Sequence, residues 1–124
     1  MAENNQGPAT DDGVIYVNQA EGLQRVLNNM KLYVKLLTKF KVDINLNELI
    51  TLVQVEDYEN AQVKAHTIKG IAANLSLIEL FKQTRALEEQ IKNKAAIEEA
   101  VLETLQACYR ETIRSIDTLI AHHG

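Results

Sequence analysis

Apolar residues recur at the spacing of an α-helix through the middle of the chain. Between positions 61 and 75 they fall at i, i+4, i+7, i+11 and i+14, as Ala61, Ala65, Ile68, Ala72 and Leu75. Residues at this spacing share one face of a helix, because successive residues turn by about 100°. An apolar face must be buried against other elements, so the segment predicts one helix of a helical bundle.

One histidine lies on the opposite side of this predicted helix. His66 projects about 140° from the middle of the apolar stripe. Lys69 and Gly70 share its outward face, and Ala73 lies one turn further on. The ordinary interpretation is a solvated surface histidine. However, a glycine inside a helix costs about 1 kcal/mol relative to alanine, and Gly70 lies beside the histidine instead of on the packing stripe. We therefore interpret Gly70 as space through which another molecule approaches the imidazole.

The residues around His66 also resemble the signature of histidine-containing phosphotransfer (HPt) domains, which reads approximately A-H-x-L-K-G-x-x-x-N-L-G. The matching positions are Ala65, His66, Ile68 in place of leucine, Lys69, Gly70, Asn74 and Leu75. Ser76 stands where the signature ends in glycine, and we interpret it as an N-cap for the helix that follows. Weaker similarity extends from about Val14 to the last predicted helix.

The rest of the sequence predicts further helices that short turns separate. We expect them over residues 18–27, 30–41, 46–55, 58–75, 77–93 and 95–121. Their predicted N-terminal caps include Asn18, Asp57 and two capping boxes, Asn45 with Glu48 and Ser76 with Glu79. Leu27 and Leu32 are expected on buried faces.

These elements predict an all-α fold. Short turns join antiparallel neighbours, so we expect an antiparallel up-and-down four-helix bundle with two short N-terminal helices covering one end. This single domain would span residues 14–124, with the apolar residues 14–17 as an extended segment packed on it. Residues 1–13 are polar and predict a disordered tail.

Composition limits the partners and the location. The chain has 124 residues, one proline and a net charge of −4. It lacks a basic patch of the density that nucleic acids require, so we expect no nucleic-acid binding. It has no signal peptide and no apolar run long enough to span a bilayer. Its single cysteine, Cys108, is expected to be a buried thiol. We expect a cytoplasmic monomer that inserts in no membrane.

Two residues of the helix after His66 are expected near the level of the imidazole if the turn centres near Ser76. Glu88 falls near the apolar stripe of its helix, where an unpaired carboxylate is costly. We expect it to reach His66 Nδ1 or Lys69 and to orient the imidazole; the alternative is that it extends to water. Arg85 is a candidate auxiliary cation. In chemotaxis-kinase relatives within the resembled family, a glutamate at the matching position has this orienting role.

The resemblance implies a phosphocarrier, not an enzyme. His66 would accept a phosphoryl group from an aspartyl phosphate on a response-regulator receiver domain and pass it onward, in a relay that includes a sensor or hybrid histidine kinase. Lys69 would meet the phosphoryl oxygens, and Gly70 would permit close approach. Mg²⁺ would belong to the receiver, and the chain would hold no cofactor or metal of its own.

Partner docking is expected around His66, on Val63 and Ala73 and on the first two predicted helices. In the second of these, Lys31, Lys35 and Lys39 repeat at i, i+4 and i+8. This stripe predicts either a solvated face or a guide for an acidic partner surface.

Other helical classes fit the residues less well or stay open. A histidine-kinase dimerisation domain would carry an acidic residue directly after the histidine and a proline soon afterwards, but Thr67 follows here and no proline lies beyond Pro8. A di-iron bundle needs Glu-x-x-His pairs, and no glutamate lies three positions before a histidine. A helical adaptor without phosphotransfer chemistry stays open, as does the kinase-phosphorylated N-terminal domain of a chemotaxis-type kinase.

Overall fold

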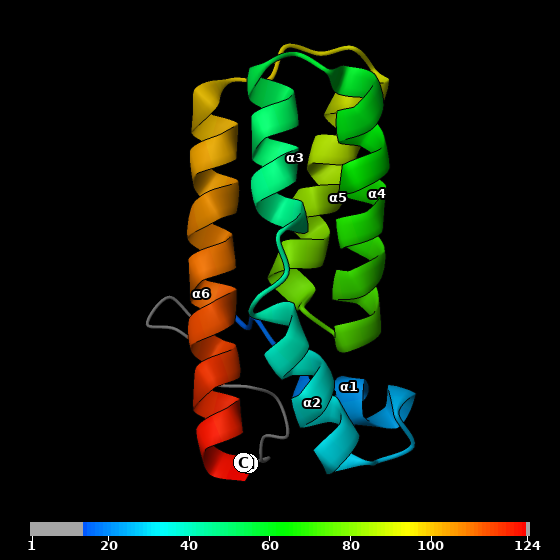
Figure 1. Cartoon of the computed structure of the whole chain (residues 1–124), viewed down its shortest axis with the longest axis vertical. Coiled ribbons are helices and arrows are strands. Elements are labelled where there is room, and N and C mark those ends of the chain that lie inside the picture. Colours follow the sequence, from blue (N-terminus) through cyan, green and yellow to red (C-terminus); the bar gives the residue numbers. More distant parts are fainter. Residues whose placement is uncertain (1–13, 124) are drawn as a thin grey trace.

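The computed structural model describes residues 14–123, and every helix or strand in that range is an α-helix (Figure 1). The helices are α1 (Gln19–Arg25), α2 (Met30–Phe40), α3 (Asn45–Gln54), α4 (Tyr58–Leu75), α5 (Ile78–Lys92) and α6 (Glu99–His123). The predicted all-α fold is confirmed. The predicted tail, residues 1–13, lies outside the described residues. Within residues 14–123, none of these helices has both the length and the apolar stretch that crossing a membrane requires.

Helix α4 lies between two neighbours and keeps one face free. Helices α3 to α6 stand side by side in Figure 1, and α1 and α2 lie together at one end of them. Helix α4 makes its most extensive contacts with α5 and α3. One apolar cluster joins the helices, and its fully buried members include Tyr33, Leu37, Leu49, Leu77, Leu80, Leu87, Leu105 and Ile116.

The segment before α1 packs on the bundle, as predicted, and lies against the turn between α4 and α5. Val17 is fully buried. The backbone N–H of Asn18 donates to the carbonyl oxygen of Ser76 at 2.9 Å, and that of Ile78 donates to the carbonyl oxygen of Tyr16 at 3.0 Å. These two hydrogen bonds attach the N-terminal segment to the end of the helix that carries His66.

Helix α2 is anchored to α6 by its C-terminal residues. The ring of Phe40 lies edge-on to that of Tyr109, with 5.8 Å between centroids, and Lys41 pairs with Asp117. Two leucines in this region are not buried, contrary to prediction. Leu27 is 90% exposed because α1 has ended at Arg25 and Leu27 lies in the loop with φ 55°. Leu32 is 39% exposed, since the inward face of α2 is that of its neighbour Tyr33.

Two of the four predicted helix caps, those of Asn18 and Asp57, are confirmed, and the cap predicted at Asn45 is wrong. The side chain of Asn18 accepts from the N–H of Glu21 at 3.1 Å, and that of Asp57 accepts from the N–H of Asn60 at 3.4 Å. Asn45 does not cap α3, because it is already the first helical residue. Asp43 instead accepts from the N–H of Asn45 at 2.7 Å.

The predicted capping box at Ser76 is also wrong. Ser76 is the C-cap of α4 and adopts the left-handed conformation, with φ 57° and ψ 44°. Its hydroxyl donates to Glu21 Oε1 at 2.7 Å, and α5 begins at Ile78 without a side-chain cap. The left-handed conformation suits glycine, which explains why the signature has glycine at this position.

Helix α6 begins four residues later than predicted. Lys94 adopts the left-handed conformation with φ 57°, and the N–H of Ala95 donates to the carbonyl oxygen of Gln90 at 2.9 Å. This turn ends α5 and leaves residues 95–98 as a connection to Glu99. Cys108 is buried within α6, as predicted, and burial raises the pKa of its thiol to about 12.

Replacement of Gly22 by alanine is expected to destabilise the fold by about 1–3 kcal/mol. A Cβ at Gly22 would overlap the ring and hydroxyl of Tyr33, which is fully buried. The Tyr33 hydroxyl donates to the carbonyl oxygen of Leu75 at 2.8 Å, so the displacement would disturb the end of α4. Urea denaturation measures the effect. Tyr33→Phe, which removes only the hydroxyl, should cost about 1 kcal/mol, and an unchanged midpoint for Gly22→Ala would contradict the packing argument.

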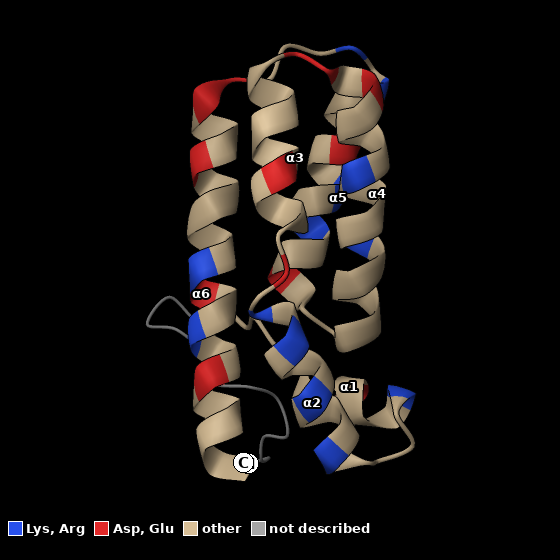
Figure 2. Cartoon of the chain, viewed as in Figure 1, with Lys and Arg blue, Asp and Glu red and all other residues tan. Residues whose placement is uncertain are grey.

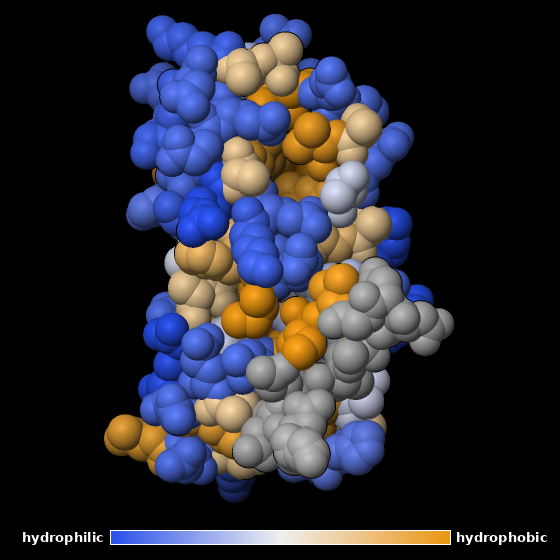
Figure 3. Space-filling model, turned by 180° about the vertical axis from the view of Figure 1, so that it is seen from behind, coloured by the Kyte–Doolittle hydropathy of each residue, from blue (hydrophilic) through white to orange (hydrophobic). Residues whose placement is uncertain are grey.

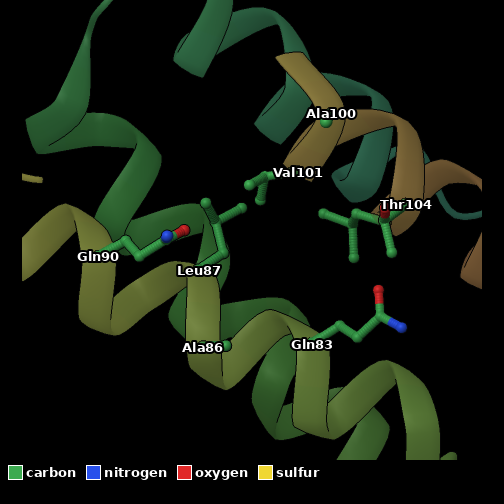
Figure 4. Close-up of a pocket in the computed structure, with 8 residues that line it drawn as sticks. Gln83, Ala86, Leu87, Gln90, Ala100, Val101 and Thr104 are labelled. Atoms are coloured by element: carbon green, nitrogen blue, oxygen red, sulfur yellow. The ribbon is translucent and has the colours of Figure 1, made fainter. Parts of the chain in front are cut away.

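A groove of about 400 Å³ lies between α5 and α6. Ala86, Leu87 and Val101 line it, and Gln83 and Gln90 border it (Figure 4). The view from behind shows apolar residues recessed among hydrophilic ones (Figure 3). Residues 83, 86 and 90 lie on the opposite flank of α5 from Glu88, so this groove is separate from the surface that carries His66.

Candidate functional site

The imidazole of His66 projects from the free face of α4. All five residues of the predicted apolar stripe are buried, namely Ala61, Ala65, Ile68, Ala72 and Leu75. The His66 side chain on the opposite side is 73% exposed. The helix begins and ends at the predicted residues, Tyr58 and Leu75. The histidine is thus held on a rigid element and open to a partner.

Glu88 of α5 contacts both His66 and Lys69. His66 Nδ1 lies 3.3 Å from Glu88 Oε2, and Lys69 Nζ lies 2.7 Å from Glu88 Oε1. The Glu88 side chain is only 6% exposed, so the alternative that it extends to water is wrong. The contact that the hairpin geometry predicts is present. Lys69 is 26% exposed and therefore lies partly between the two helices, not fully in solvent.

The charge on Glu88 determines which nitrogen of a neutral His66 ring keeps a free lone pair. Burial alone would raise the pKa of the Glu88 carboxyl, but the hydrogen bond and charge of Lys69, with a contribution from His66, hold this pKa below its ordinary value. An ionised carboxylate only accepts hydrogen bonds. The Nδ1 of His66 must therefore carry the proton in this contact, which leaves the lone pair of the neutral ring on Nε2.

The surface beside the imidazole is open. Gly70 is exposed, and a Cβ built on it would meet nothing within 4 Å. No contact among the described residues therefore requires glycine at this position. This observation supports the interpretation that the gap admits a second molecule.

The other predicted site residues take no part in the contact between His66, Lys69 and Glu88. The guanidinium of Arg85 lies over the ring of Phe81, 5.7 Å from its centroid, and it forms no ion pair with Glu88 among residues 14–123. Val63 is 65% exposed and Ala73 is partly buried. Lys31 and Lys35 are exposed on α2, where Figure 2 shows a row of basic residues.

The sequence interpretation missed a polar network on the other side of α4. Lys64 Nζ lies 2.7 Å from Glu48 Oε1 and donates to Asn45 Oδ1 at 3.1 Å. This network joins α3 to α4 and positions the helix that carries His66. A signal was present, because Lys64 falls between the apolar stripe and the outward face. Within residues 14–123, no three histidine, cysteine or acidic residues gather in a cluster that could hold a metal ion.

A comparison with known families agrees with this geometry. The model of the Hpt domain matches residues 36–115, which include His66, Lys69, Gly70 and Glu88. The chain belongs to the HPt domain family. Comparisons with curated proteins and with solved structures found no match. HPt domains are histidine phosphotransfer modules of two-component signalling, and they act as phosphocarriers that work with receiver domains and histidine kinases.

Proposed function

We propose that this HPt domain accepts a phosphoryl group on His66 from an aspartyl phosphate of a response-regulator receiver domain and passes it to another response regulator. The observation that carries the proposal is an exposed imidazole whose Nδ1 contacts a buried carboxylate. We further propose that α3 to α6 form an antiparallel up-and-down bundle, and that the protein acts as a cytoplasmic monomer.

In the proposed transfer, the Nε2 lone pair of His66 attacks phosphorus while the bond between phosphorus and the aspartate oxygen breaks. The electron pair of that bond leaves with the aspartate, which becomes a carboxylate. The proton on Nδ1 stays in the contact with Glu88, so the phosphorylated ring keeps its orientation. Transfer to the next receiver reverses these steps. The catalytic contribution of this chain is therefore positioning and charge stabilisation.

Lys69 is proposed to stabilise the transferring group. One of the three ammonium donors of Lys69 is directed to Glu88, and the side chain keeps a partly exposed surface. The remaining donors are available to phosphoryl oxygens near Nε2. We propose that the chain holds no cofactor of its own and that Mg²⁺ is bound by the receiver. Arg85, one turn before Glu88 in α5, lies over Phe81 and is proposed as an auxiliary cation that acts on association with the partner and not on the transferred group.

The proposed docking surface extends from Val63 to Ala73 along α4. Val63 supplies exposed apolar area, and the partly buried Ala73 adds little bulk. Lys31 and Lys35 of α2 are proposed to guide an acidic partner.

A second candidate differs only in the phosphoryl donor. Glu88 contacts His66 Nδ1, as expected of the orienting glutamate in chemotaxis-kinase relatives. This contact favours a donor of the same kind, the ATP-binding domain of such a kinase. The two candidates are distinguished by offering the chain radiolabelled phosphoreceivers in one experiment and a kinase ATP-binding domain with labelled ATP in another.

The proposed function is tested by incubating the chain with receiver domains charged by labelled acetyl phosphate. We expect label that is lost in acid and retained in alkali, because a phosphoramidate bond to nitrogen has this behaviour whereas an acyl phosphate is lost in alkali. Label that survives acid, or no label from any receiver or kinase domain, would leave the helical adaptor as the better interpretation.

Replacement of Gly70 by alanine is expected to change stability and transfer in opposite directions. The added methyl group meets open space, so the helix should gain about 0.5–1 kcal/mol of unfolding free energy. The same methyl group obstructs the partner, so the rate of transfer from a receiver should fall by about tenfold. Urea denaturation and the transfer assay measure the two effects. An undiminished transfer rate would show that the gap at Gly70 does not serve partner approach.

A further inference from the structure

A second concavity lies along α4 from His66 and is bordered by basic side chains. It has a volume of about 310 Å³ and lies between α1, the end of α4 and the start of α5. Three exposed cations line it, namely Arg25 of α1 and Lys82 and Arg85 of α5. Ala73, which also lines it, comes seven residues after His66, about two turns or 10 Å along the helix.

The basic concavity keeps an excess of positive charge within the described structure. Among residues 14–123, no carboxylate forms an ion pair with Arg25, Lys82 or Arg85. Arg85 instead lies over the ring of Phe81, which fixes its guanidinium without cancelling its charge. Among the described residues, one carboxylate lines the concavity, that of Glu21, which accepts the hydroxyl of Ser76 at 2.7 Å, so three cations face one anion. The concentration of cations is notable in a chain whose net charge is −4.

The basic concavity lies on the same side of α4 as the imidazole. Around the helix axis, Ala73 lies within about 20° of His66, whereas Lys64 lies about 160° away. A groove of about 680 Å³ between α3 and α4 includes Thr51, Val63 and Lys64, and its one cation among the described residues, Lys64, is paired with Glu48. Open space at Gly70 connects His66 with Ala73 along α4. Of the two surfaces, only the basic concavity offers unpaired positive charge beside the imidazole.

We propose that the basic concavity is the docking site for an acidic surface of the receiver domain. The inference rests on the proposed function and specifies the side from which the partner approaches. An aspartyl phosphate and the carboxylates around it are anionic, so Arg25, Lys82 and Arg85 attract the receiver and hold it on the α1–α5 side of His66. The three cations act on association, whereas His66 and Lys69 act on the transferred group.

The test compares the wild-type chain with the double variant Lys82→Glu/Arg85→Glu. The phosphoryl donor is a receiver domain that transfers label to the wild-type chain. We expect kcat/KM for transfer to fall by at least about tenfold at about 0.05 M salt, and the deficit to shrink at about 0.5 M salt. The kcat at saturating receiver should stay within about twofold. Lys82→Gln/Arg85→Gln should give an intermediate loss. The matched control is Arg110→Glu, an exposed cation on α6, which should stay within about twofold of wild type.

Two further measurements separate docking from chemistry. Potassium phosphoramidate is a small phosphoryl donor that needs no docking surface, so it should label His66 in the double variant as fast as in wild type. Thr51→Glu places one negative charge in the groove between α3 and α4 and should not slow transfer. If the double variant has the same kcat/KM as wild type, or if Thr51→Glu loses as much kcat/KM as the double variant, the docking inference is overturned. The proposed function is not affected by either result. If no receiver labels the wild-type chain, the proposed function fails and this inference fails with it.

Discussion

His66→Gln is expected to reduce phosphoryl transfer by at least about a thousandfold, because it removes the only group proposed to form a bond to phosphorus. The lone pair of the glutamine amide nitrogen is delocalised into its carbonyl, so it cannot replace Nε2. The fold should be unaffected. The His66 side chain is 73% exposed, and a surface substitution of this kind changes the unfolding free energy by about 0.5 kcal/mol or less.

The measurement is acid-labile label after incubation with a phosphorylated receiver, together with a urea denaturation curve for each protein. The control is His122→Gln, because His122 is an exposed histidine near the end of α6. It should transfer at the wild-type rate. Acid-labile label on His66→Gln in wild-type amount would place the acceptor elsewhere and would remove the basis for the proposed function.

The helix that carries His66 could be predicted in full because its determinants are local. The apolar stripe follows one helical period, and Asp57, directly before the first turn, caps it by accepting from the N–H of Asn60 three residues on. The contact between His66 and Glu88 could also be predicted. Two helices joined by a short turn stay in register, since each rises by the same distance per residue. A count of residues from the turn therefore places Glu88 near the level of His66.

The role of Ser76 could not be predicted because its partner is distant in sequence. Its hydroxyl donates to Glu21, which precedes it by 55 positions, and the turn takes a left-handed conformation that favours glycine. The local pattern of Ser76 and Glu79 resembles a capping box, but the tertiary contact with α1 prevails. The same limit applies to α2, where a local helical pattern did not reveal that Leu32 stays partly exposed.

The basic concavity was missed for a related reason. Arg85 was predicted near the level of His66, but its contact with Phe81 and its proximity to Arg25 depend on where α1 packs. Nothing in the spacing of Arg25 and Lys82, 57 positions apart, indicates that they line one surface. Sequence periodicity therefore predicts what one helix presents, whereas a surface shared by three helices requires the structure.

Glu88→Ala is expected to slow transfer by about 10- to 100-fold and to lower the unfolding free energy by about 1–3 kcal/mol. The imidazole loses the acceptor that fixes its Nδ1–H tautomer, and the partly buried Lys69 loses its counter-charge. Glu88→Gln keeps an acceptor for Nδ1–H, so it should recover part of the rate. ¹⁵N chemical shifts of the His66 ring report the tautomer directly. Glu89→Ala, at an exposed neighbour, should change neither rate nor tautomer.

The charge of Glu88 also predicts how stability depends on pH. In the folded protein the carboxyl has a pKa below its ordinary value of 4.5, because the effects of Lys69 and His66 outweigh burial. At a pH near that ordinary value the unfolded chain therefore binds more protons than the folded one, so the contribution of Glu88 to stability rises with pH. The advantage of wild type over Glu88→Gln should be constant above about pH 5 and should decline as the pH falls through the folded pKa. A constant advantage down to about pH 3 would mean that the carboxylate gains nothing from its two partners on folding.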